Sequence, residues 1–140
     1  RLAVDTIRDT LLSSGDLTVE SLVHAVKAGN TAIFTQGSAE PGLAGMGTTL
    51  VGLGFVPDGM LVVNVGDSRA YRFRGDEVVQ ITEDHTLVRE LIRAGALKPE
   101  HAENHPVSHM LTRSLGPAPT VEVDCFLMSE LPEPGDVYLL

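Results

Sequence analysis

The sequence predicts an α+β fold, because helical and strand patterns occur in separate blocks instead of alternating along the chain. Two helical patterns come first, then a group of strand patterns, then more helix and finally two further strand patterns. The 140 residues are enough for one domain with a buried core. The composition, 43% hydrophobic and 21% charged, is typical of a globular protein.

Residues 1–37 predict a pair of helices. Apolar residues recur at helical spacing from 2 to 12, and Gly15 follows as a helix terminator. Thr18 is a preferred N-cap residue and stands before a second apolar stripe, which predicts a helix to about residue 36. The stripe consists of Leu22, Val26 and Ile33. A loop rich in Gly and Pro is expected to follow.

Residues 47–82 predict four antiparallel strands in meander order. Pro57-Asp58-Gly59 is a strong hairpin signal between the first two, and Gly75-Asp76 separates the last two. The first two patterns are almost continuously apolar, which favours a sheet covered on both faces. The four patterns cover residues 48–56, 60–65, 69–74 and 77–81.

Residues 83–117 predict a helix followed by irregular chain. An apolar stripe ends at Gly95, and Pro99 suits the first position of a short helix. The stretch from 97 to 117 is polar, rich in histidine and weakly patterned. The last segment, 118–140, predicts two further strands, over 120–128 and 136–140.

Composition excludes several classes of protein. The net charge of −9 argues against nucleic-acid binding, which requires a basic surface. The longest uncharged run, Pro41–Pro57, contains five glycines and is not a membrane helix. The single cysteine, Cys125, excludes an internal disulfide and lies in an apolar strand pattern, which favours a core residue over a reactive thiolate. The cytoplasm is the expected compartment.

Asp67 is the candidate metal ligand. It follows the apolar strand 60–65 within Gly66-Asp67-Ser68-Arg69, where the chain leaves the sheet. A carboxylate at such a strand end can bind a metal ion. It can equally form an Asx turn with its own backbone, and the residues alone leave both interpretations open. Arg69 is either a fork for phosphate or a solvated strand residue.

The histidines and nucleophiles give weaker signals. His101, His105 and His109 recur every four residues, as zinc ligands on one helix would. Pro106 interrupts that helix, so we interpret them as exposed loop residues. No nucleophile elbow and no phosphate-binding loop is present, and no catalytic residue is predicted.

Several segments, taken in order, resemble the metal-dependent protein phosphatases, the PPM or type 2C serine/threonine phosphatases, and within them the bacterial enzymes. The segments are "AGNTAIF", "GMGTTLVGLGF", "LVVNVGDSRAYRFRGDEVVQITEDHT", "HMLTRSLG" and "PGDVYLL". The resemblance implies part of a four-layer α-β-β-α sandwich with two antiparallel sheets. Residues 1–37 would be its helix pair, 47–82 its meander, 83–117 a flap and 118–140 strands. The N- and C-terminal parts of the domain are expected to be missing.

The resemblance also implies a function. Members of the family hydrolyse phosphoserine and phosphothreonine in proteins with a water activated by Mn²⁺ or Mg²⁺, two or three ions in the complete domain. Asp67 matches a ligand of a third, weaker ion, and a cognate Ser/Thr kinase is the expected partner. The Glu-Asp pair, the Asp-Gly-Met-Gly-Gly-His element and the downstream Asp ligands of the family have no counterpart here.

Two hypotheses about function follow from these observations. The chain is either the central part of an active phosphatase, inactive as an isolated piece, or a degenerate binding or regulatory module without catalysis. We favour the first, because Asp67 and the flap segment are present. Missing strands would expose sheet edges, so association through those edges is also expected.

Overall fold

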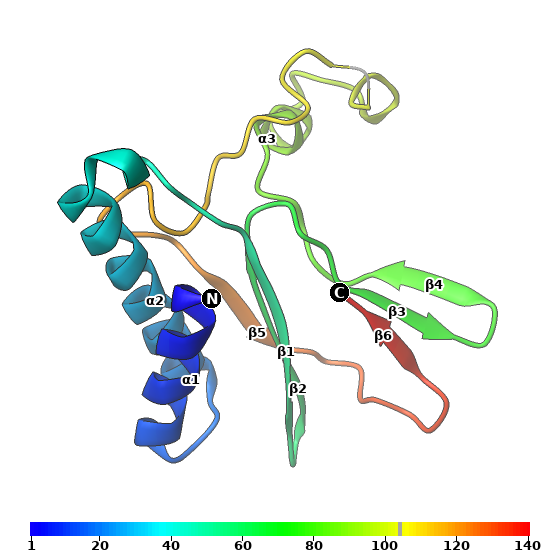
Figure 1. The fold of residues 1–140 in the computed structure, drawn as a ribbon. Helices are drawn as coiled ribbons and strands as arrows, with labels where there is room; N and C mark the ends of the chain where they lie inside the picture. The colour runs from blue at the N-terminus through cyan, green and yellow to red at the C-terminus, as the bar shows by residue number, and fades with distance from the viewer. Residues whose placement is uncertain (104) are drawn as a thin grey trace.

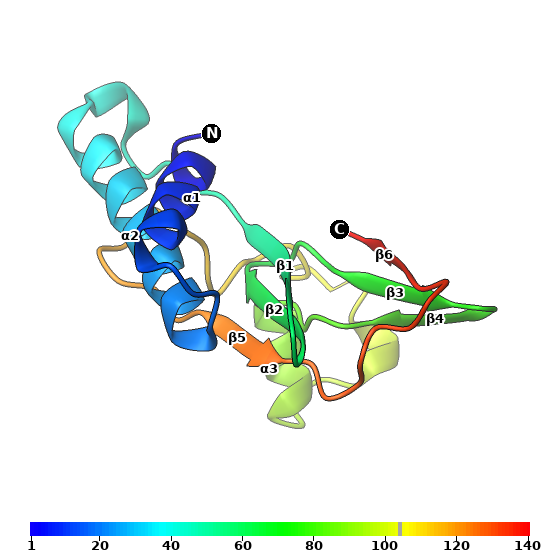
Figure 2. The ribbon, with the colours of Figure 1, turned by 90° about the horizontal axis from the view of Figure 1, so that it is seen from below.

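A computed structural model describes residues 1–103 and 105–140 and confirms the α+β fold with two antiparallel sheets. Three layers follow one another in both ribbon views: a helix pair, a first sheet of order β1-β2-β5, and a second sheet of order β4-β3-β6 (Figures 1 and 2). The helix pair covers the face of the first sheet that is turned away from the second. The main core therefore lies between the first two layers.

The helix pair is formed by α1 (Leu2–Ser14) and α2 (Val19–Ala39), as predicted. Thr18 caps α2, with its side chain accepting a hydrogen bond from the backbone of Ser21 while the Ser21 hydroxyl accepts one from Thr18. The helix runs to Ala39, further than expected, and a short 3₁₀ helix, η1 (Pro41–Leu43), follows. The glycine-rich loop is correspondingly shorter.

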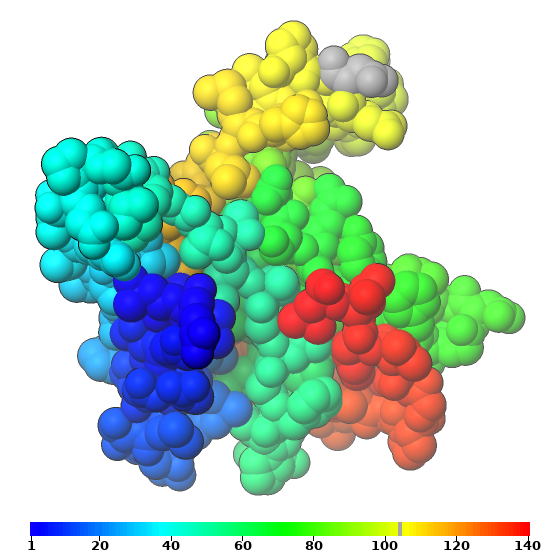
Figure 3. All heavy atoms as spheres, viewed as in Figure 1, coloured from blue at the N-terminus to red at the C-terminus, as the bar shows by residue number. Residues whose placement is uncertain are grey.

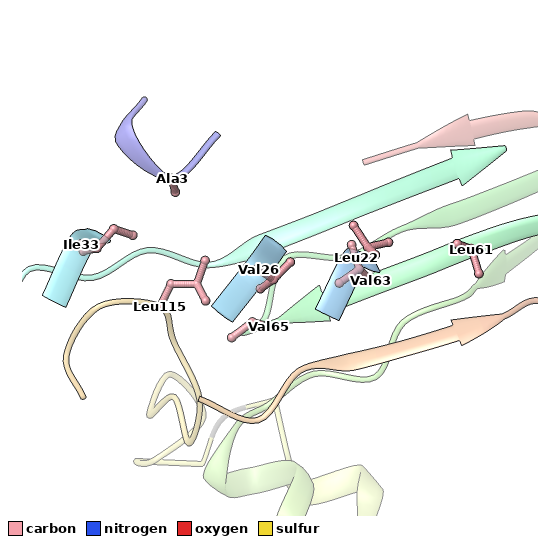
Figure 4. Packing of buried hydrophobic residues seen from close by; sticks show 8 residues of the cluster. All are labelled: Ala3, Leu22, Val26, Ile33, Leu61, Val63, Val65 and Leu115. Atoms are coloured by element: carbon pink, nitrogen blue, oxygen red, sulfur yellow. The ribbon is translucent and has the colours of Figure 1, made fainter. Parts of the chain in front are cut away.

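The core cluster joins α2 to the first sheet. Its apolar side chains are at least nine-tenths buried and come from α1, α2, β2 and the segment before β5 (Figure 4). Burial of this kind is the main favourable contribution to folding. The cluster consists of Ala3, Leu22, Val26, Ile33, Leu61, Val63, Val65 and Leu115.

The first sheet contains β1 (Leu50–Val56), β2 (Gly59–Val65) and β5 (Asp124–Leu127), with β2 in the centre and buried along its whole length. The predicted hairpin is present, pairing Val56 with Gly59. Strand β5 is much shorter than the predicted strand 120–128. Side chains before it still pack on the core, although that stretch is not paired as a strand.

The expected single meander is wrong, because the second hairpin belongs to another sheet. Strands β3 (Tyr71–Arg74) and β4 (Glu77–Gln80) pair with β6 (Val137–Leu139) and not with β2. The chain crosses between the sheets through residues 66–70. A turn at Gly66, with φ of 110°, directs it out of the first sheet.

The flap segment contains α3 (Leu87–Arg93) and the 3₁₀ helix η2 (Pro99–His101). The helix begins at Leu87, later than the expected Glu83, because residues 82–85 bind the crossing segment and Thr86 acts as the N-cap. Figure 3 shows this part of the chain standing out from the body beyond the ends of the sheets.

The second sheet leaves much apolar surface in solvent. All four residues of β4 are exposed, which contradicts a meander covered on both faces. On the outer part of this sheet Val78, Val137 and Leu139 are each more than half exposed. No helix in residues 1–103 and 105–140 has the length and apolar character needed to span a membrane.

Candidate functional site at the end of β2

Asp67 lies in the crossing between the sheets, two residues after β2 ends. Its side chain is exposed, and within the described part of the chain it makes no hydrogen bond or ion pair. The Asx-turn interpretation predicted a bond from this carboxylate to its own backbone, and the described residues show none. The oxygens therefore face solvent and are free to accept a ligand.

Gly66 fixes the turn before Asp67. A Cβ atom at this position would stand 2.3 Å from the Thr49 methyl carbon, and the φ of 110° is one that side-chain-bearing residues rarely adopt. On the other side of Asp67, the Ser68 hydroxyl lies 2.7 Å from the Thr49 hydroxyl. The Gly-Thr-Thr and Gly-Asp-Ser segments are thus in direct contact, and the turn is held on both sides.

His85 binds Gly66 through both of the glycine's backbone groups. The Gly66 N–H donates to His85 Nδ1 at 3.0 Å, and the Gly66 carbonyl accepts from the His85 backbone N–H at 2.9 Å. The buried Asn64 amide donates to the Glu83 carbonyl at 2.9 Å and to the Gly66 carbonyl at 3.4 Å. The crossing is therefore anchored to residues 82–85 by short, buried contacts.

Asp124, the first residue of β5, completes this arrangement. Its carboxylate lies 3.0 Å from His85 Nε2 and accepts from Arg113 Nη1 at 2.7 Å. Burial favours the neutral acid, but the hydrogen bond from His85 and the hydrogen bond and charge of Arg113 outweigh it and hold the pKa of Asp124 below its usual range. Arg113, at the end of the flap segment, also pairs with Glu122.

Arg69 is neither a free phosphate fork nor an unpaired surface residue. Its guanidinium grips Asp84 through Nε and Nη2, with distances of 2.6 to 3.1 Å, and donates to the Tyr71 hydroxyl at 3.3 Å. These hydrogen bonds raise the pKa of Arg69 above its usual range, the bond to Asp84 contributing most. The pair joins the crossing to residues 82–85.

The residues that sequence reasoning missed are Asp84, His85 and Asp124. The first two lie in "ITEDHT", which contributes to the family resemblance but to no candidate site in the local sequence. Nothing in their local pattern indicates that they contact residues 66–69, since the contacts form across 15 to 19 positions. Asp124 lies further still along the chain, at the start of β5.

The other candidates stand apart from this turn. His101 and His109 are exposed, as expected for loop residues, whereas His105 is partly buried and its Nδ1 accepts a 3.4 Å bond from the Val107 amide. Cys125 packs against the core cluster, and burial raises the pKa of its thiol. In residues 1–103 and 105–140 no three His, Cys, Asp or Glu side chains gather as a metal site.

The donor at this turn suits one class of ligand. A lone carboxylate fits a hard divalent cation such as Mn²⁺ or Mg²⁺, which prefers oxygen and keeps several waters. A polar cleft of about 340 Å³ opens beside the crossing, between the end of the second sheet and α3. Its lining includes Arg69, Asp84 and Arg89, so the cleft presents both signs of charge.

Comparison with known proteins gives consistent results. No family model matches the chain. It is 42% identical, over 126 residues that make up 90% of its length, to the serine/threonine protein phosphatase PstP of Mycobacterium tuberculosis. The chain spans between about a quarter and about half of the length of the curated relatives it matches.

Solved structures agree with the relatives. The PPM Ser-Thr phosphatase MsPP of Mycobacterium smegmatis, in complex with cacodylate, superposes with a TM-score of 0.83 and 36% identity, over 98% of this chain and 58% of that one. A catalytic domain of PstP in complex with two manganese ions gives 0.69 and 32% identity, over 97% and 57%.

Proposed function

The chain belongs to the bacterial PPM-type serine/threonine phosphatases, and from this premise we propose that it forms part of a metal-dependent enzyme that hydrolyses phosphoserine and phosphothreonine in proteins. The observation that carries the proposal is the turn after β2. There a rigid backbone presents the Asp67 carboxylate to solvent with no partner in the described residues. The relatives named as phosphatases support the reaction class.

Asp67 is proposed as one ligand of a Mn²⁺ or Mg²⁺ ion, in a complete domain that holds two or three such ions. A manganese complex among the structural neighbours supports the choice of metal. When bound, such ions lower the pKa of a coordinated water and stabilise charge that develops on the phosphoryl group. The described residues supply this single carboxylate and no cluster of three ligands, so we expect the chain alone to be inactive.

The protein substrate is proposed to lie across the polar cleft beside α3. That cleft lies between the crossing and the flap segment, and its lining includes Arg69 and Arg89, each paired with a carboxylate. We propose further that the enzyme opposes a Ser/Thr kinase and acts in the cytoplasm. The relatives that are named as Ser/Thr protein phosphatases support phosphoprotein substrates.

Self-association is a further part of the proposal. The exposed strand β4 and the apolar side chains of the second sheet offer both an unpaired edge and a hydrophobic face. We expect isolated copies of the chain to pair through this sheet. Sedimentation at several concentrations tests it, and a monomer at all of them would contradict the expectation.

A chimera tests the phosphatase proposal. This chain replaces the matching 126-residue region of M. tuberculosis PstP, and hydrolysis of para-nitrophenyl phosphate is measured with and without Mn²⁺. We expect turnover by the chimera that depends on Mn²⁺, and none by the isolated chain. Turnover by the chain alone would contradict the ligand assignment. A folded but inactive chimera would contradict the proposed function.

The role of Asp67 is tested in the same chimera. Asp67→Asn removes the charge and keeps the shape, so we expect the Mn²⁺ concentration for half-maximal rate to rise about tenfold. The matched variant is Asp84→Asn, in which a nearby carboxylate that already pairs with Arg69 is changed. If Asp84→Asn alone shifts the Mn²⁺ requirement, the ligand at this turn is Asp84 and the assignment to Asp67 is wrong.

A further inference from the structure

We propose that His85 is a positioning residue that holds Gly66 and thereby directs the Asp67 carboxylate toward the cation. The inference rests on the proposed function, because it takes Asp67 as a metal ligand. It concerns a residue 18 positions away, which neither touches Asp67 nor reaches the solvent beside it: His85 is only 7% exposed.

The contact between His85 and Gly66 is a closed pair of hydrogen bonds. One joins the Gly66 amide to the ring nitrogen Nδ1, and the other joins the His85 amide to the Gly66 carbonyl. Both lie away from water, so loss of the ring acceptor would leave a buried N–H without a partner. The backbone would then have to rotate to recover a bond, and Asp67 is the next residue along it.

The acceptor role of Nδ1 fixes the protonation of the ring. A backbone N–H can only donate, so Nδ1 carries a lone pair and the proton of the neutral ring is on Nε2. That proton points to Asp124, whose carboxylate is 3.0 Å away. Arg113 Nη1 lies 3.5 Å from Nε2, but both nitrogens then carry protons, so Arg113 cannot bond the ring there and instead donates to Asp124. Asp124 therefore selects the tautomer that Gly66 needs.

The other contacts of the turn make the direction of the Asp67 side chain dependent on the hydrogen bonds between His85 and Gly66. The Asp67 side chain has no bond of its own in the described structure, so its direction follows the backbone. Gly66 is pressed against Thr49 on one side and held by His85 on the other. Ser68 is fixed by its contact with Thr49. Asp67 lies between these two anchored residues. If Gly66 were released, the direction of the Asp67 side chain would no longer be fixed.

The competing explanation is that His85 is a buried residue that only fills space. Two substitutions distinguish this explanation from the positioning role. His85→Asn keeps an oxygen acceptor near the position of Nδ1 but cannot reach Asp124. His85→Gln keeps a donor near the position of Nε2 but offers no acceptor to Gly66. If the ring only filled space, the smaller Asn would be the more damaging change. If it positions Gly66, Gln is the more damaging.

The experiment is solution NMR on the 140-residue chain at pH 7. Hydrogen exchange of the Gly66 amide reports the grip, exchange of the Val63 amide in the centre of β2 reports global opening, and broadening of the Asp67 amide signal by added Mn²⁺ reports the cation. We expect His85→Gln to speed Gly66 exchange about tenfold or more relative to Val63 and to raise the Mn²⁺ needed for half-broadening several-fold. His85→Asn is expected to stay within about threefold of the parent in both.

The outcomes separate this inference from the function beneath it. Equal effects of the two variants on Gly66, or no effect of His85→Gln, would overturn it. The inference would also be overturned if His85→Gln speeds Gly66 exchange but leaves the broadening of the Asp67 signal by Mn²⁺ unchanged, provided that Asp67→Asn abolishes this broadening. If Asp67→Asn leaves the broadening intact, the ligand role of Asp67 fails, and the metal part of the inference falls with it.

Discussion

Two of the three connections between the sheets are held mainly by different kinds of interaction. Residues 66–70 connect β2 to β3 through buried, neutral hydrogen bonds to residues 82–85, with one more exposed ion pair, Arg69 with Asp84, beside them. Residues 128–136 connect β5 to β6 through charged groups: Arg74 binds Asp136 with two bonds of 2.7 Å and also reaches Glu130 and Glu133. Buried hydrogen bonds demand one geometry, whereas charge clusters tolerate several. The carboxylate proposed for metal binding lies in the connection that has one geometry.

The neutral connection should be the more sensitive to shape. Gly66→Ala would place Cβ 2.3 Å from Thr49 at a strained φ, so we expect a loss of about 3 kcal/mol in the free energy of unfolding. Urea denaturation measures it. Gly75→Ala is the matched control, because Gly75 also has positive φ but open space around it, and about 1 kcal/mol is expected there. Similar losses at both sites would mean that the contact with Thr49 yields easily.

The charged connection should be the more sensitive to acid. The hydrogen bonds from Arg74, and then the Glu133 backbone N–H, hold the pKa of Asp136 well below its usual range. A carboxylate with a depressed folded pKa contributes stability that is complete above its unfolded pKa of about 3.9 and is lost as pH falls toward the folded value. We expect the urea midpoint to drop between pH 5 and 2.

Asp136→Asn identifies the source of that acid sensitivity. The variant should lower the urea midpoint at pH 7, by less than Gly66→Ala does, and flatten the decline below pH 4. The reduction should be smaller because Arg74 is partly solvated and keeps two other carboxylates. An unchanged acid profile would assign the decline to other carboxylates.

The smallest effect is expected where the two kinds of interaction meet. Asp124 is charged but serves the neutral connection, and its side chain is 47% exposed. After discounting for solvent, Asp124→Asn should cost less than about 1 kcal/mol at pH 7. The cost should shrink as pH falls below 4, because the depressed pKa of Asp124 means that its contribution is lost in acid. Chemical denaturation at pH 7 and pH 3 tests both statements.

Local patterns were sufficient to predict the elements of the fold but not their assembly. The N-cap at Thr18 and the hairpin at Pro57-Asp58-Gly59 act within a few residues, and both were found. The assignment of β3 to a second sheet depends on the turn at Gly66. Position 66 must be glycine because a Cβ atom there would clash with Thr49, which lies 17 positions earlier. No window of sequence contains that contact.

The site shows the same limit. Asp67 is a candidate from the local sequence because a carboxylate directly after an apolar strand, where the chain leaves the sheet, can bind a metal ion. His85 and Asp124 have ordinary local surroundings, and their meaning arises only when β5 pairs beside β2. Arg69 was noticed as a charge, yet its partner Asp84 lies beyond a whole hairpin. Whether Arg69 is available to bind phosphate therefore could not be predicted without knowing that it pairs with Asp84.

The exposed apolar surface of the second sheet has a thermodynamic consequence. If copies of the chain pair through β4 and the apolar side chains around it, the folded state is stabilised by mass action and the unfolded state is not. The melting temperature of the chain would then rise with its concentration. Any single value of its stability would describe a particular solution as much as it describes the molecule.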